Sequence, residues 1–143
     1  MHSITLRFLA AQSAPLQAGR IPGGTVLRWV DEAAGACASA WSQGVCVAAF
    51  LGGAHFRRPI RPGDLVEVQA RLAYTTDTQM YLAVEVRGGP LQGGPLEDVV
   101  HCVAVYTALD ASEAPCAVAP FSPESPGDIA LAQRVQAHLH AAR

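Results

Sequence analysis

Asp31 is the residue of this sequence with the clearest capacity for chemistry. It lies inside a long stretch of helical periodicity, at the border between the apolar and polar arcs. It also lies about two turns beyond the start of that stretch, where the helix dipole no longer accounts for an acid. A carboxylate in such a place can act as a general base or as a nucleophile. The structural alternative is an ion pair with Arg28, three residues earlier, although Glu32 is better placed for that pair.

Two adjacent glycines, Gly23 and Gly24, precede the same helical stretch. One interpretation is a loop that needs positive φ angles, which glycine adopts readily. The other is that the free N–H groups at the helix start point at an anion or at a developing oxyanion. Together with Asp31, this second interpretation describes an electrophile held at the helix start and a base beside it.

Three arginines, Arg57, Arg58 and Arg61, lie within five residues of one loop. All ten basic residues of the chain are arginine, and only 15% of the residues are charged. Such clustering favours a polyanionic ligand, phosphate above all, over a plain solvated loop. His55, at the start of this loop, is a candidate base or ligand contact, with a structural role as the alternative.

The composition indicates one compact domain. The chain has 143 residues, half of them hydrophobic, and a net charge of −2 with a pI near 6.2, which gives no electrostatic footprint for nucleic acid. The apolar excess predicts a homo-oligomer, because obligate interfaces resemble a protein core. No apolar run is long enough for a membrane span, and the first nine residues do not resemble a signal peptide, so we expect a cytoplasmic protein.

The four cysteines form no CxxC pair and have no zinc-like spacing with the five histidines. They lie in apolar segments, where a free thiol behaves as a small hydrophobic side chain. We therefore expect core thiols in a reducing compartment, and no metal site.

The hydrophobic patterns predict seven elements. A strand at 3–9 precedes a loop and a helix from 23 to about 42, and a second helix follows a cap at Ser125. Four further strands are predicted at residues 45–51, 65–74, 79–87 and 99–109, the middle two forming a hairpin. We interpret residues 1–124 as the core of the domain and residues 125–143 as a C-terminal helix of the same domain.

The first helix is apolar around most of its circumference, which predicts a buried helix. Its interior residues are mostly small, so a sheet can wrap it closely. The predicted fold class is therefore α+β, with one long central helix wrapped by an antiparallel sheet. One copy leaves a sheet edge open, and pairing with a second copy would cover it.

Two segments, residues 21–34 and 55–66, together resemble the acyl-CoA thioesterases of the hotdog superfamily. The nearest branch is that of the broad-specificity bacterial enzymes and the brain acyl-CoA hydrolase, and the resemblance runs from about residue 4 to 109. It implies hydrolysis of acyl-CoA to a fatty acid and CoA, with no cofactor beyond the CoA of the substrate. It implies a hotdog homodimer, often assembled into a hexamer as a trimer of dimers, with sites at the dimer interface.

The resemblance puts Asp31 at the catalytic acid of the family, and Gly23 and Gly24 at its oxyanion-side backbone. His55 and the three loop arginines would then contact the substrate. The family usually has an asparagine in the loop before the helix, where this chain has Leu16, so Gln17, Gln12 or a partner-chain residue would have to replace it. The family also often has His or Phe before the paired glycines, and this chain has a proline there.

Two other functions remain open at this stage. A non-catalytic acyl-CoA-binding sensor would keep the fold without turnover, and the missing asparagine favours it. A hotdog enoyl-CoA hydratase or dehydratase is suggested by His55 and the prolines after it. In those enzymes, however, the histidine precedes the long helix, whereas His55 follows it.

Overall fold

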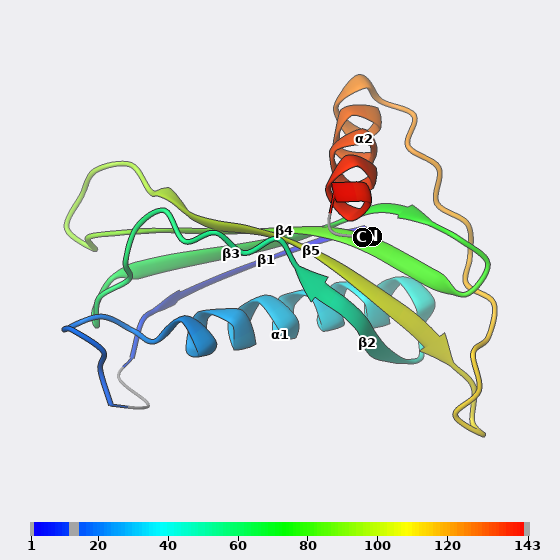
Figure 1. The fold of residues 1–143 in the computed structure, drawn as a ribbon, viewed down its shortest axis with the longest axis horizontal. Coiled ribbons are helices and arrows are strands. Elements are labelled where there is room, and N and C mark those ends of the chain that lie inside the picture. The colour runs from blue at the N-terminus through cyan, green and yellow to red at the C-terminus, as the bar shows by residue number, and fades with distance from the viewer. Residues whose placement is uncertain (1, 12–14, 142–143) are drawn as a thin grey trace.

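The computed structural model describes residues 2–11 and 15–141. Its five strands form one antiparallel sheet in the order β1-β3-β4-β5-β2. The elements are β1 (Ser3–Leu9), α1 (Gly23–Ser42), β2 (Val45–Gly52), β3 (Leu65–Thr75), β4 (Gln79–Gly89), β5 (Glu97–Leu109) and α2 (Pro126–Ala141). Helix α1 lies along one face of the sheet and α2 stands on the other (Figure 1). The predicted order of elements and the α+β class are confirmed.

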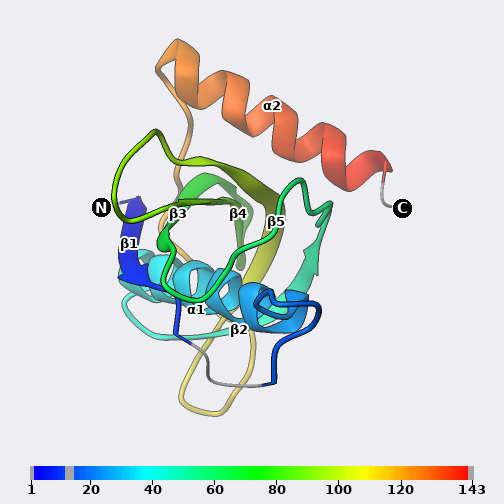
Figure 2. The ribbon, with the colours of Figure 1, turned by 90° about the vertical axis from the view of Figure 1, so that its left-hand side faces the viewer.

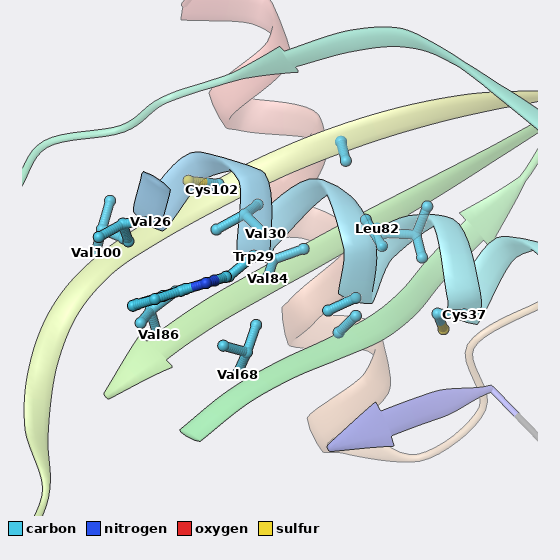
Figure 3. Packing of buried hydrophobic residues seen from close by; sticks show 14 of the residues in the cluster. Val26, Trp29, Val30, Cys37, Val68, Leu82, Val84, Val86, Val100 and Cys102 are labelled. Carbon is cyan, nitrogen blue, oxygen red and sulfur yellow. The ribbon is translucent and has the colours of Figure 1, made fainter. Parts of the chain in front are cut away.

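Helix α1 is built to lie close to the sheet. Its buried face carries Ala33, Ala34 and Ala38, each fully buried, so the strands approach its backbone. Larger side chains fill the space toward its start, where Val26, Trp29 and Val30 meet valines of β3, β4 and β5 (Figure 3). The helix ends at Gln43, whose left-handed conformation (φ 56°) lets its N–H donate to the Ser39 carbonyl.

The sheet covers α1 on one side only. Figure 2 shows the curved sheet arching over the helix, with β1 and β2 at its two edges. Exposed residues of α1 include Arg28, Asp31, Glu32, Ala36 and Ala40. The prediction of a helix buried around most of its circumference is thus wrong for a single chain, because a sheet of five strands cannot close around it.

The predicted hairpin of β3 and β4 is confirmed, and the predicted side of β4 is the buried one. Met80, Leu82, Val84 and Val86 of β4 are all fully buried. The pairing of β4 with β5 begins at Gly88 opposite Glu97, two residues before the predicted start of that strand. The acidic pair at 97 and 98 hid this extension in the sequence.

The C-terminal helix α2 packs on the outer face of the sheet. Its start is capped as predicted, with the Asp128 N–H donating to Ser125 Oγ at 3.1 Å. Leu131, Val135 and Leu139 are buried against outward-facing residues of the sheet, which gives the domain a second, smaller core.

The four cysteines are free thiols; Cys37 and Cys102 are buried, whereas Cys46 and Cys116 are half-buried. Neither helix of the described chain is long and apolar enough to cross a membrane.

Candidate active site

The Asp31 carboxylate is held by a residue that is distant in the sequence. The hydroxyl of Tyr106, on β5, donates a hydrogen bond to Asp31 Oδ1 and lies 3.0 Å from the backbone oxygen of Asp31. Tyr106 is only 5% exposed, whereas Asp31 is exposed in the single chain. Asp31 makes no ion pair with Arg28 or with any other described residue, so this carboxylate is held by a neutral donor.

The Tyr106 ring lies beside Gly35 of α1. Gly35 lies one turn after Asp31 on the same face of α1, and a Cβ there would lie 3.6 Å from both the hydroxyl and Cε2 of Tyr106. Burial, and then the hydrogen bond to Asp31, hold the pKa of the Tyr106 phenol far above its usual range. The phenol therefore stays protonated near neutral pH and remains a donor to the carboxylate.

Tyr106 was not among the residues selected from the sequence. It lies in a strand that is apolar on both faces, where it looks like one more core aromatic. A usable signal exists, since a buried tyrosine hydroxyl normally has a hydrogen-bond partner. The sequence does not say which of the polar groups on α1 supplies it.

The start of α1 leaves two amides free. The N–H groups of Thr25 and Val26 both donate to the Pro22 carbonyl, at 3.0 and 3.3 Å. The amides of Gly23 and Gly24 make no hydrogen bond to any described residue, so they can donate to an anion, which the helix dipole also favours. The Phe56 ring packs against Gly23, 3.4 Å from where a Cβ would lie, whereas the space at Gly24 is open.

A pocket of ≈ 320 Å³ lies at this helix start and carries positive charge. We refer to it as the helix-start pocket. Three guanidinium groups and the Phe56 ring contribute to its wall. Its lining comprises Gln17, Arg20, Ile21, Gly23, Phe56, Arg57, Arg58 and Pro59. Arg20 was not selected from the sequence, because it lies alone in the preceding loop.

Residues of the segment 53–59 are divided between two pockets. Phe56 and Arg58 face the helix-start pocket, and Gly53 and His55 line a second pocket of ≈ 220 Å³ beneath α2. Arg57 lines both. Arg58 also makes an ion pair with Glu97 at 2.7 Å, and Arg57 lies 3.8 Å from Asp98.

The remaining predicted contacts lie apart from this pocket. Arg61 lines neither pocket; its backbone N–H donates to the Asp64 carboxylate. His55 belongs to the pocket beneath α2, together with His101 and His138. At the position of the missing asparagine, Leu16 packs against the core.

Of the two glutamines considered as its replacement, Gln17 lines the helix-start pocket, and Gln12 lies outside the described residues. No described residues form a cluster of three or more metal-ligating side chains.

Asp31 and the paired glycines are separated along α1. Asp31 lies seven positions after Gly24, which at ~1.5 Å per residue is about 10 Å along the axis. Within one chain, the two groups therefore cannot contact the same small carbonyl group. They could act on one carbonyl group if a second chain supplied one of them.

A family model of the thioesterase superfamily matches residues 18–92, which include α1, the arginine loop and the hairpin strands. The chain belongs to the thioesterase superfamily. Asp31 and every lining residue of the helix-start pocket except Gln17 fall within the matched part. No curated protein matches the chain in sequence.

Solved structures of other thioesterases share the fold of this superfamily member. An acyl-CoA hydrolase from Staphylococcus aureus, solved with butyryl-CoA and CoA, is 18% identical with a TM-score of 0.87, over 98% of this chain and 85% of that one. An acyl-CoA hydrolase from Bacillus cereus is 23% identical with a TM-score of 0.84, over 98% and 88%. A hexameric thioesterase from Yersinia pestis is 26% identical with a TM-score of 0.74, over 80% and 93%. The predicted hotdog fold is confirmed by these similarities.

Proposed function

We propose that this thioesterase hydrolyses acyl-CoA to a free carboxylic acid and CoA, with Asp31 as its catalytic carboxylate. The observation that carries the proposal is the exposed carboxylate of Asp31 on the central helix of a thioesterase-superfamily fold. A buried tyrosine of the sheet, Tyr106, holds this carboxylate by a hydrogen bond. The structurally similar hydrolase from Staphylococcus aureus was solved with butyryl-CoA, which supports a CoA thioester as the substrate class.

The reaction requires two groups of the protein, a carboxylate and a site that stabilises an anion. Asp31 either removes a proton from water as the water adds to the thioester carbonyl, or attacks that carbonyl itself and forms an acyl anhydride, which water hydrolyses after the thiolate has left. The C–S bond then breaks, and the CoA thiolate leaves. A thiol has a pKa of ~8.5, so this leaving group needs no strong general acid. The free amides of Gly23 and Gly24 are the natural donors to the carbonyl oxygen as it gains negative charge.

We propose that each site is built from two chains. The separation of about 10 Å along α1 requires Asp31 and the glycine amides that serve one substrate to come from different copies. The open edge strand β2 offers the surface for pairing, because Val45, Val47 and Leu51 are 66%, 45% and 37% exposed. The exposed face of α1 would be covered by the same contact. Similar structures that are hexameric support a trimer of such dimers.

The helix-start pocket is our proposed contact for the phosphates of CoA. Guanidinium groups bind phosphate through paired hydrogen bonds, and Arg20, Arg57 and Arg58 line this pocket. We propose a cytoplasmic location, since four free thiols suit a reducing compartment.

Two alternatives compete with hydrolysis. A binding-only sensor is favoured by Leu16, which cannot serve as the polar group that the family usually has there. A hydratase is less favoured, because its histidine would be His55, which lines the pocket beneath α2 and not the surroundings of Asp31.

Release of free CoA from a panel of acyl-CoA thioesters, followed with a thiol reagent, tests the proposal. The substitution Asp31→Asn should keep CoA binding and lower kcat by at least ~10²-fold, the usual loss for an essential base or nucleophile. Glu32→Gln is the matched control, because Glu32 is the neighbouring exposed carboxylate of α1. Binding of acyl-CoA without CoA release would favour the sensor, and turnover by Asp31→Asn at the wild-type rate would show that Asp31 is not the catalyst.

A further inference from the structure

We infer that Tyr106 is a positioning residue for hydrolysis: its hydroxyl fixes the orientation of the Asp31 carboxylate and so sets kcat without touching the substrate. This inference rests on the proposed function of Asp31.

The two residues differ in burial, and this gives the contact its purpose. Asp31 projects from the open face of α1, where an aspartate would otherwise exchange among rotamers. Tyr106 is buried in the sheet, and its ring is held along Gly35. A hydrogen bond from a buried phenol to one carboxylate oxygen selects one orientation of the exposed carboxylate. Orientation matters because a displacement of about 1 Å in a reacting group can cost ~10²-fold in rate.

The direction of the hydrogen bond also defines which oxygen is free. Tyr106 donates to Oδ1, and Oδ2 has no hydrogen-bond partner among residues 2–11 and 15–141. Because the phenol keeps its proton across the neutral range, Oδ1 remains engaged as an acceptor. Oδ2 is then the oxygen that faces water or the thioester carbonyl.

The substitution Tyr106→Phe removes the hydroxyl and keeps the ring that packs along Gly35. We expect kcat to fall by about 10- to 100-fold with KM within about twofold of wild type, the pattern of a lost transition-state contribution. Tyr81→Phe is the matched control, because it deletes a hydroxyl on the neighbouring strand that donates to Gln79 Oε1 at 3.0 Å, away from Asp31. Its kcat should stay near wild type.

A double-mutant cycle separates positioning from a general structural effect. If Tyr106 acts through Asp31, adding Tyr106→Phe to Asp31→Asn should cause little further loss of kcat, since the group being oriented is already gone. Thermal unfolding of each variant measures stability independently, and the midpoint of Tyr106→Phe should not account for its loss of rate.

Three results would overturn the inference. The first is a wild-type kcat for Tyr106→Phe, and the second is a change in KM alone. The third is that Tyr106→Phe lowers kcat by the same factor in the Asp31→Asn background as in wild type. Failure of the proposed function looks different, because Asp31→Asn alone would then retain turnover. A large decrease of kcat in Asp31→Asn together with an unchanged kcat in Tyr106→Phe would support Asp31 as the catalyst and exclude a positioning role for Tyr106.

Discussion

Arg58 offers the sharpest test of how this protein holds the phosphates of CoA. Its side chain is 28% exposed, faces the helix-start pocket and makes an ion pair with Glu97 at 2.7 Å. The substitution Arg58→Ala should raise KM for acyl-CoA and leave kcat nearly unchanged, because a phosphate contact far from the thioester binds substrate and transition state equally.

The size of the effect follows from what Arg58 must exchange. A hydrogen bond to a charged group contributes about 1.5–3 kcal/mol, but Arg58 would give up its contact with Glu97 and is partly exposed to solvent. We therefore expect a contribution slightly below this range, about 1.4 kcal/mol, which corresponds to a rise of about tenfold in KM. The substitution Glu97→Gln removes the competing carboxylate and should lower KM.

Steady-state kinetics on two substrates make the assay specific. An acyl-CoA carries the phosphates, whereas the matching acyl-N-acetylcysteamine lacks them and should be insensitive to Arg58→Ala. Arg61→Ala is the control, since Arg61 lines neither pocket. Raised salt should weaken acyl-CoA binding by wild type, because exposed charges are screened over ~8 Å at physiological ionic strength. An unchanged KM for Arg58→Ala would refute the placement of the phosphates at the helix start.

The remaining predictions concern assembly and pH. Light scattering at micromolar concentration should give the mass of at least a dimer. The substitution Val47→Glu on the exposed edge strand should shift the protein toward monomer and lower its activity. An active monomer would contradict the two-chain site. Burial raises the pKa of both the Cys37 and Cys102 thiols to about 11 from 9.0. Because the unfolded chain loses these protons first, their contribution to stability is complete below pH 9 and is lost as the pH rises toward about 11. Urea unfolding measured between pH 9 and 11 should show the free energy of unfolding decreasing, and the decrease should be smaller in Cys102→Ala.

The elements of this fold were predictable because their patterns are local. Alternation at Met80, Leu82, Val84 and Val86 defines a strand with one buried face, and the small residues of α1 indicate close packing against a sheet. The exposed half of α1 was not predictable as such. Its apolar character suits burial in an assembly, and a sequence does not distinguish burial within one chain from burial between two.

The candidate site was only partly predictable, for a related reason. Asp31 stands out through its position on the helical wheel, which is local information. Its partner Tyr106 lies 75 residues away, and the contact exists only because the sheet order brings β5 over α1. Arg20 and Arg58 likewise come to line one pocket only through the fold. The division of the arginine loop between two pockets depends on the direction in which each side chain leaves the backbone.

The division of segment 53–59 between two pockets makes its length as meaningful as its composition. Gly53 and His55 line the pocket beneath α2, and Phe56 and Arg58 line the helix-start pocket, so a residue inserted or deleted there would displace groups of at least one pocket. Surface loops that carry no such groups accept changes of length more readily. In homologues of this protein, the spacing between Gly53 and Pro59 should therefore be kept, even where the residues themselves differ.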